Sequence, residues 1–350
     1  MPALAMRPGE TQRLRGLDAL RGVAVVGVTL FHFTTATHPQ PILFTLPSGK
    51  LGVQLFFMLS GFVILMTLER AKGLADFAVR RVARLYPCYL VCTVASGLLC
   101  FSVGFNPNSV PAGSTLPNLV LGLPYLLLLP MLDPSYWTLT YEVIFYAAAG
   151  WLFCTIGIRR VEIACLVWLA IGIAGQAAHL MAHHPRLAIL LNVDYGDLFV
   201  AGMMIYRLST GRKTALGLAA LIVALALPAI PFTPDPERLQ NAAMIGLFAA
   251  AIAGVAAGKL RVVEMRPLLF LGNISYPLYL IHLMFGFYVI AGLESNGIDA
   301  NLAIVAAVIA VVLFAAALHY AVERPAQHAI RAAYSRRDRC TSATEMHIGG

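Results

Sequence analysis

The chain has 350 residues, of which 59% are hydrophobic and only 12% charged, and its formal net charge is +8. About a quarter of the residues in a soluble domain are charged, so the composition excludes an ordinary soluble protein. Apolar runs of about 20 residues recur from end to end, which is typical of a polytopic helical membrane protein. The six cysteines show no regular spacing, so neither a disulfide framework nor a metal site is predicted.

Ten apolar segments are long enough to be predicted as membrane-spanning helices. In chain order they cover residues 17–36, 50–69, 84–104, 137–157, 162–181, 187–206, 214–230, 240–258, 268–290 and 302–322. An eleventh stretch, 116–130, is short and interrupted by Pro124. Hydropathy alone leaves open whether this stretch crosses the membrane or forms a loop.

The distribution of positive charge decides between these two topologies, because Lys and Arg concentrate on the cytoplasmic side of a membrane. With ten spans and a cytoplasmic N-terminus, only Lys50, Arg186 and Arg238 of the 25 basic residues face outward. If 116–130 also spanned, the later segments would invert and most basic residues would lie outside. We therefore predict an all-α integral membrane protein with ten spans, both termini in the cytoplasm and 116–130 as an outer loop.

The first span carries two ionisable residues, Arg21 and His32, with ten residues between them. Eleven steps of about 100° bring both side chains to one helix face, about 16 Å apart along the axis. Ionisable groups inside a membrane segment commonly mark a functional path. The alternative is that Arg21 reaches back to the inner headgroups and His32 is a packing residue. Asp18, one turn before Arg21, favours the functional interpretation.

Glu142 is expected one to two turns below the outer face, because the fourth span begins at Trp137. His32 is expected at a similar depth, so we predict that Glu142 orients the His32 imidazole and leaves its other nitrogen as a base. The alternative is a structural glutamate that is hydrogen-bonded to Trp137 or Thr138.

Arg81 and Arg84 lie three residues apart at the inner end of the third span and share one helix face. Arginine guanidinium groups suit phosphates, so these residues, with Arg21, are candidates to hold a phosphate-rich cytosolic ligand. Ordinary positive-inside anchoring is the alternative. Tyr86 follows in the same motif and is included among the candidate ligand-binding residues.

Two further segments supply candidate polar residues. The start of the ninth span brings Ser275, Tyr276, Tyr279 and His282 into the membrane, where lining a cavity and simple packing remain open. In the outer half of the sixth span Asp194 and Asp197 lie three residues apart. They are candidates to contact a sugar or to pair with a cation, and Trp137 is a further candidate acceptor contact.

Together these segments resemble the membrane acyltransferase-3 family, the integral membrane O-acyltransferases that modify glycans. The motifs that carry the resemblance are LRGLDALRG (14–22) with His32, GVQLFFMLSGF (52–62) with Ser60, RVARLYP (81–87), WTLTYE (137–142), GNISYPLYLIH (272–282) and ERP (323–325). The resemblance covers nearly the whole chain. It implies a membrane domain at 13–326 between cytoplasmic tails at 1–12 and 327–350, and we expect the stand-alone form without a fused hydrolase-like domain.

The resemblance implies transfer of an acyl group, usually acetyl, from cytosolic acyl-CoA to a hydroxyl of a surface or lipid-linked glycan at the bacterial inner membrane. By motif, the catalytic residues are His32 and Glu142, and the acyl-CoA-binding residues are Arg21, Arg81, Arg84 and Tyr86. Candidate cavity-lining residues are Asp18, Ser60, Ser275, Tyr276, Tyr279 and His282. No tightly bound cofactor and no nucleic-acid partner are expected; the partners are acyl-CoA, the glycan acceptor and membrane lipid.

The expected mechanism is direct attack of the acceptor hydroxyl on the thioester, with His32 as general base; an acyl-histidine intermediate is the variant. The rival class is a transporter or flippase that uses the same cavity to move an intact solute or lipid-linked sugar. A membrane scaffold is the third class, and the ionisable residues inside the apolar segments argue against it.

Overall fold

The computed structural model describes residues 8–36, 38–107, 109–232 and 235–348, without the side chains of 8–14 and 337–348. Most of the predicted N-terminal tail therefore lies outside the described residues, as do the last two residues of the C-terminal tail. The described part is helical and contains no strand. Its α-helices are α1 (Pro8–Thr35), α2 (Gly52–Leu68), α3 (Leu74–Phe101), α4 (Thr115–Asn118), α5 (Leu123–Leu126), α6 (Trp137–Ile156), α7 (Val161–Ala177), α8 (Leu180–His183), α9 (Pro185–Leu191), α10 (Gly196–Ser209), α11 (Ala215–Ala226), α12 (Arg238–Ala256), α13 (Arg266–Asn273), α14 (Ser275–Ser295), α15 (Ala300–Leu318) and α16 (Arg324–Ile348).

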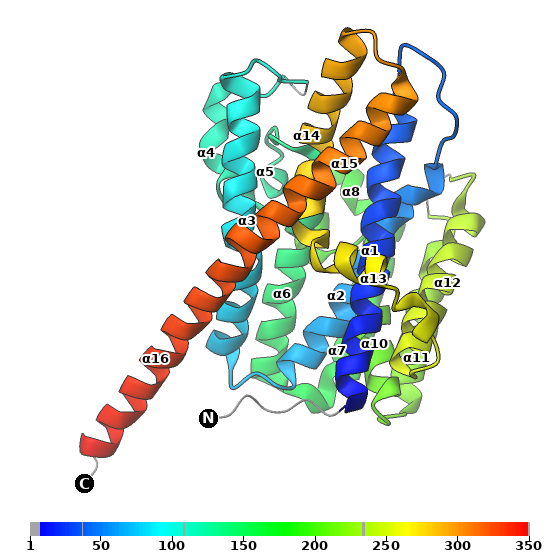
Figure 1. Cartoon of the computed structure of the whole chain (residues 1–350). Helices are drawn as coiled ribbons and strands as arrows, with labels where there is room; N and C mark the ends of the chain where they lie inside the picture. The colour runs from blue at the N-terminus through cyan, green and yellow to red at the C-terminus, as the bar shows by residue number, and fades with distance from the viewer. Residues whose placement is uncertain (1–7, 37, 108, 233–234, 349–350) are drawn as a thin grey trace.

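Shorter helical turns connect several of these helices. Single turns of 3-10 helix are η1 (Pro47–Leu51), η2 (Ala112–Ser114), η3 (Pro134–Tyr136), η4 (Ile158–Arg160), η5 (Leu227–Ala229) and η6 (Arg261–Val263), and η7 (His319–Glu323) is a π-helical turn between α15 and α16. In η7 the His319 imidazole lies 2.7 Å from a carboxylate oxygen of Glu323. Helix α1 begins, and α16 ends, at the same end of the bundle (Figure 1).

Eight helical segments in the described residues are long and apolar enough to cross a membrane. This confirms a multi-pass helical membrane architecture. The predicted spans 162–181 and 214–230 correspond to α7, with 17 residues, and α11, with 12. Because a perpendicular span needs about 20 residues, these two helices fall short of that length, and the count of ten stays a prediction. The outer helix α15 exposes large apolar side chains such as Leu302 and Leu313, as expected for a surface that faces lipid.

Glycines bring the central helices into close contact. Gly61 of α2 lies against the Phe199 carbonyl of α10, and Gly202 of α10 lies against the Met58 carbonyl of α2. Small residues favour such close backbone approach in membrane bundles, where apolar side chains gain little by leaving lipid. A second close contact joins α13 to α1, where a Cβ added at Gly272 would collide with the Asp18 carbonyl.

Replacement of Gly272 with alanine should therefore lower stability, whereas the same change at Gly246 should not. Gly246 lies inside α12, and a Cβ added there meets no atom within 4 Å. Overpacking costs about 1–3 kcal/mol, while Gly→Ala at an open helical site gains about 0.5–1 kcal/mol. The thermal unfolding midpoint in detergent should fall for Gly272→Ala and hold or rise for Gly246→Ala. Equal midpoints would contradict the close α1–α13 contact.

The segment between α3 and α6 folds back into the bundle. As predicted, 116–130 does not cross the bundle as one helix, since α4 and α5 have only four residues each. The buried side chain of Asn118 holds this segment together: its amide nitrogen donates to the Pro130 carbonyl at 3.0 Å, and its oxygen accepts from the Leu132 backbone at 2.9 Å. The Tyr89 hydroxyl of α3 donates to the Asn118 carbonyl at 2.6 Å.

This inward fold sets the depth at which α6 begins. The Tyr136 hydroxyl donates to the Leu280 carbonyl at 3.0 Å, and Thr138 is hydrogen-bonded to Tyr279 at 2.9 Å. Leu280 is the sixth of the 21 residues of α14, so α6 starts well inside the bundle. In Figure 1, α6 occupies the lower part of the bundle, whereas α3 runs its full height.

Two of the predicted spans are interrupted. The sixth, 187–206, divides into α9 and α10 at Asn192, which has a positive φ of 54° and donates to the Tyr141 carbonyl at 3.1 Å. The ninth, 268–290, divides into α13 and α14 at Ile274. Irregular backbone at membrane depth occurs where it is buried in protein or lines a cavity. Both breaks therefore indicate a position that is buried in protein or borders a cavity.

Candidate active site

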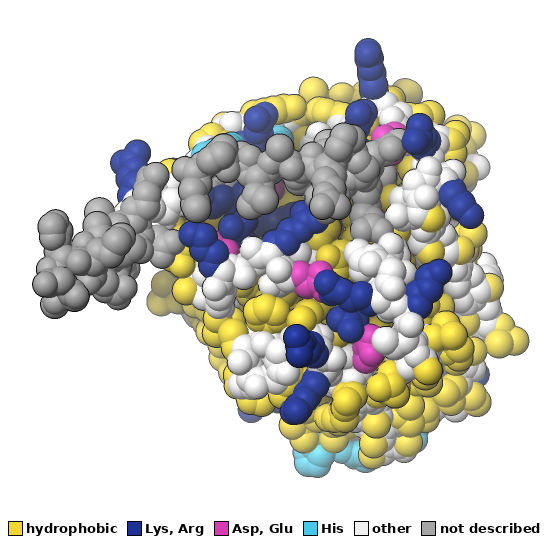
Figure 2. Space-filling view, turned by 90° about the horizontal axis from the view of Figure 1, so that it is seen from below, with side chains coloured by type: hydrophobic (Ala, Val, Ile, Leu, Met, Phe, Trp, Pro, Cys, Tyr) yellow, Lys and Arg dark blue, Asp and Glu magenta, His cyan; other side chains and the backbone are white. Residues whose placement is uncertain are grey.

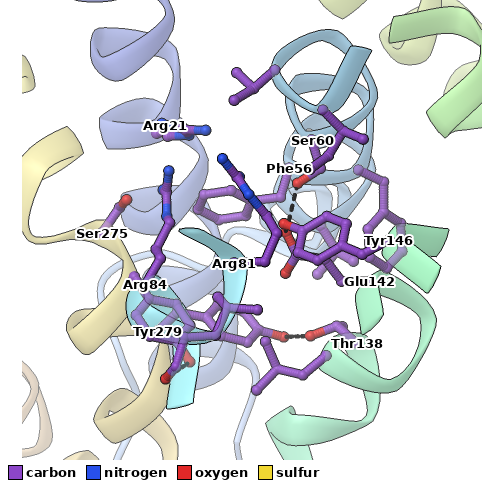
Figure 3. Close-up of a pocket in the computed structure, with 17 residues that line it drawn as sticks. Arg21, Phe56, Ser60, Arg81, Arg84, Thr138, Glu142, Tyr146, Ser275 and Tyr279 are labelled. Atoms are coloured by element: carbon purple, nitrogen blue, oxygen red, sulfur yellow. Dashed lines mark hydrogen bonds between the residues drawn. The ribbon is translucent and has the colours of Figure 1, made fainter. Parts of the chain in front are cut away.

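A cavity lies between α1, α2, α3, α6 and α14 (Figure 3). The volume of the cavity is about 60 Å³. Its charged lining residues are Arg21, Arg81, Arg84 and Glu142, and its uncharged polar ones are Ser60, Thr138, Tyr146, Ser275, Tyr276 and Tyr279. The structure thus gathers in one cavity residues from five of the six motifs that the sequence singled out.

The three arginines converge from two helices. Arg21 comes from α1, Arg81 and Arg84 come from successive turns of α3, and their guanidinium groups point toward one another in Figure 3. Asp18 pairs with Arg21 at 3.1 Å from one turn earlier on α1. Among the residues that line the cavity, three cations therefore face a single carboxylate, Glu142.

The guanidinium group of Arg81 lies over two aromatic rings. Its guanidinium carbon lies 5.7 Å from the Phe77 ring centre and 5.8 Å from that of Tyr146, distances at which cation–π attraction acts. One terminal nitrogen donates to Thr67 at 3.3 Å. The buried Nε has no hydrogen-bond partner within the protein. An arginine with an unused buried donor is suited to an anionic ligand.

Glu142 does not contact His32, and the predicted pairing of these two residues is wrong. Its carboxylate accepts a hydrogen bond from Ser60 of α2 at 2.8 Å and another from Tyr146, one turn later on α6. The prediction assumed that α6 starts at the outer face. Because 116–136 folds into the bundle, α6 starts deeper and Glu142 lies at the level of the arginines.

His32 lies beyond the Tyr279 end of this cavity and does not line it. Its half-buried imidazole packs against His282 of α14, with ring centres 5.2 Å apart. Tyr279 forms the connection, since it lines the cavity and its ring lies 5.4 Å from that of His282. Phe56 packs on Tyr279 at 6.0 Å and also lines the cavity. The aromatic pair Phe56 and Tyr279 thus stands between the arginines and the two histidines.

The other candidate lining residues lie at or beside the cavity. Ser275 and Tyr276 line it, and their hydroxyls donate to the carbonyls of Gly272 and Leu85, each at 2.8 Å. Tyr86, in contrast, does not reach the cavity. Its ring is exposed and its hydroxyl donates to the Leu119 carbonyl at 3.2 Å, because two residues after Arg84 the α3 surface has turned to another face.

The candidate acceptor contacts lie in an aromatic cluster beside the cavity, at the α9–α10 break. Trp137 packs on Tyr195 at 5.4 Å and Tyr141 packs on Tyr195 at 4.9 Å between ring centres, with Phe57 and Tyr125 at the edge. Asp194 is partly exposed beside this cluster and interacts with the Tyr141 hydroxyl. Asp197 is 6% exposed, and one of its carboxylate oxygens has no partner within the protein.

Tyr146, Thr138 and the apolar lining residues, Phe56 among them, are cavity residues that were not among the predicted site residues. Tyr146 lies one helical turn after Glu142, so the i,i+4 spacing was a usable signal. Phe56 lies within the motif at 52–62 but carries no polar group, and its sequence context does not distinguish it from the equally apolar Leu55 and Phe57, which are buried beside it.

Comparison with known proteins assigns the chain to a family. The family profile described as "Acyltransferase domain" matches residues 14–320. The exopolysaccharide production protein ExoZ of Rhizobium meliloti (strain 1021) is 31% identical over 311 residues, 79% of this chain and 89% of that protein. Acyltransferase MdmB of Streptomyces mycarofaciens is 25% identical over 313 residues, 79% of this chain and 80% of that protein.

A third relative matches only in part. O-acetyltransferase OatA of Staphylococcus aureus (strain NCTC 8325 / PS 47) is 33% identical over 105 residues, 28% of this chain and 15% of that protein. No solved structure matches the chain. The profile and ExoZ together cover most of the sequence, and the helices are those of a multi-pass membrane protein. The chain belongs to the membrane acyltransferase-3 family.

Proposed function

We propose that this protein transfers an acyl group, most simply acetyl, from cytosolic acyl-CoA to a hydroxyl of a surface or lipid-linked glycan. Membership of the acyltransferase family supports the reaction type, acyl transfer. The names of two relatives include exopolysaccharide production and O-acetyltransferase. The acyl-CoA donor and the glycan acceptor are the parts that this proposal adds.

One observation carries the donor assignment: the excess of positive charge in the cavity. Three guanidinium groups meet two carboxylates, Glu142 in the cavity and Asp18 beside Arg21, so one positive charge is left over. One buried arginine donor also has no partner. An uncompensated charge is costly to bury unless a counter-charge occupies the site. The phosphates of acyl-CoA would supply that counter-charge, and arginine forks bind phosphate in a bidentate manner.

We further propose the ten-span topology with both termini in the cytoplasm of a bacterial cell, in its inner membrane. The charges at the two ends of the bundle support it. Arg15 and Glu264 pair at the end where α1 begins, while Lys50 and Glu237 pair at the opposite end. Figure 2 views the end from which α1 starts and shows many Lys and Arg side chains with few acidic ones between them. By the positive-inside rule, this distribution supports a cytoplasmic placement of that end.

This orientation gives the transfer a direction. The phosphates bind at the arginines, and the acyl-pantetheine arm extends along α1 toward His32. Helix α1 is continuous from Pro8 to Thr35, so Arg21 and His32 are about 16 Å apart along its axis. An extended pantetheine arm is about 15–20 Å long. Phe56 and Tyr279 must turn aside for the arm to pass, which makes them the entry to the reaction site.

The chemical step is acyl transfer between a thioester and an alcohol. His32 takes the proton of the acceptor hydroxyl while the oxygen attacks the thioester carbonyl. The carbon–sulfur bond then breaks, and the imidazolium returns the proton to the departing CoA thiolate. The acceptor enters from the outer side, where Trp137, Tyr195 and Asp194 offer aromatic faces and a carboxylate. These groups suit the apolar faces and hydroxyls of a sugar ring.

Mass spectrometry of surface glycans from a strain that lacks this gene tests the proposal. The deletion should remove one acyl mass from one sugar, and the wild-type gene should restore it. The same membranes should accumulate label in glycan when supplied with radiolabelled acetyl-CoA. Coupled uptake of an intact solute without any labelled product would instead support a transporter and overturn the proposal.

A further inference from the structure

His282 is a buried histidine whose protonation state is fixed by its surroundings. Its side chain is fully buried in α14, and its Nδ1 lies 2.7 Å from the Tyr279 carbonyl oxygen one turn earlier. A carbonyl oxygen can only accept a hydrogen bond, so Nδ1 carries the proton. A neutral imidazole with its proton on Nδ1 presents a lone pair at Nε2.

That lone pair has no hydrogen-bond partner within the protein, although Nε2 is buried. Buried polar atoms without a partner are uncommon, and each costs about 1–3 kcal/mol. An apolar side chain would fill the same space without this cost. The unpartnered acceptor therefore points to a donor that reaches it in another state of the site.

His32, whose ring packs against that of His282, is able to supply such a donor. The two ring centres are 5.2 Å apart and the ring planes are inclined by 48°. At this separation, a His32 ring turned so that one nitrogen points at Nε2 would be close enough for an N–H···N hydrogen bond. His32 belongs to α1 and His282 to α14, two helices whose contact is fixed nearby by Phe33 against Gly286.

We propose that His282 is the positioning residue for His32. In the acyl-transfer reaction proposed above, on which this inference rests, His282 Nε2 accepts the hydrogen bond of one His32 nitrogen. That bond fixes the His32 tautomer and leaves the other nitrogen unprotonated toward the acceptor hydroxyl. Such support by a second group is how a catalytic imidazole is usually oriented. His282 thus takes the role that sequence reasoning gave to Glu142.

Two amide substitutions separate the nitrogens of His282. In His282→Gln the side-chain amide reaches the position of Nε2 and can accept from His32. In His282→Asn the shorter amide reaches only the position of Nδ1 and retains the bond to the Tyr279 carbonyl. Acyl transfer is measured in membranes with radiolabelled acetyl-CoA, with kcat and donor KM determined separately. The thermal midpoint in detergent checks that each variant is folded.

The proposal predicts that His282→Asn lowers kcat about 10- to 100-fold, the range for loss of an orienting partner, with an unchanged donor KM. His282→Gln should retain most of the rate. Equal rates for wild type and His282→Asn would overturn it. Equal losses in both variants would also overturn it, since they would assign His282 to packing.

If neither variant folds, the ¹⁵N shifts of histidine-labelled wild-type protein provide the second test. His282 should carry its proton on Nδ1, and a proton on Nε2 would refute the positioning role. These outcomes are distinct from failure of the proposed function. In that case the wild-type protein itself would transfer no label from acetyl-CoA, whatever the state of His282.

Discussion

His32→Ala is expected to abolish acyl transfer while leaving the protein folded and able to bind acyl-CoA. A positioned general base contributes about 10²- to 10⁴-fold to rate, and alanine can neither take nor return the proton. The donor cavity should be intact in this variant because His32 does not line it. The measurement is label transfer from radiolabelled acetyl-CoA to glycan, together with CoA binding to the purified protein.

His184→Ala is the matched control, because His184 is exposed at the outer end of α8, outside the cavity. It should transfer acyl groups at the wild-type rate. If His32→Ala retains turnover, the base assignment fails, and with it the positioning role of His282. If His32→Ala instead loses CoA binding with its fold intact, His32 would belong to the donor site rather than to the reaction site.

The double substitution Arg81→Ala with Arg84→Ala is expected to raise the donor KM strongly and to change kcat at saturating donor much less. A hydrogen bond between charged groups contributes about 1.5–3 kcal/mol, which corresponds to about 10- to 100-fold in affinity for each arginine. The rise in donor KM should be larger than the loss of two surface charges would cause, because both side chains converge on the same space as Arg21.

Arg80→Ala is the control for this pair. Arg80 is adjacent in sequence but pairs with Asp76 at 2.9 Å and does not line the cavity. Ordinary positive-inside anchoring predicts similar effects for all three arginines. A normal donor KM in the double variant, or an equal rise in Arg80→Ala, would therefore favour anchoring over donor binding.

Sequence patterning predicted the helical membrane architecture and the non-spanning segment 116–130 because both depend on hydropathy and charge summed over many residues. It did not predict where helices break or how deep they begin. The break at Asn192 depends on a positive φ and on a hydrogen bond to Tyr141. The depth of α6 depends on Asn118 drawing the preceding loop inward. Both are tertiary contacts between residues distant in the chain.

For the candidate site, helical spacing put Arg81 and Arg84 on one face, and the charge distribution put Arg21 at the same membrane side. The structure brings all three to one cavity. The partnership of His32 with Glu142 failed because it compared depths along two helices with different starting levels. The same error hid the neighbour that His32 does have. His282 was recognised as a polar residue inside a span, yet only the packing of α14 on α1 brings the two rings within 5.2 Å of each other.

The central claim, that acyl groups pass from a cytosolic CoA thioester to an outer glycan, is tested most directly in sealed inside-out membrane vesicles. Radiolabelled acetyl-CoA is added to the exposed cytoplasmic face, and glycan enclosed in the vesicles is isolated and counted. We predict that label appears in the enclosed glycan as an ester, released by mild base, in wild-type vesicles and not in His32→Ala vesicles. Label that never reaches the enclosed glycan in wild-type vesicles would contradict the account.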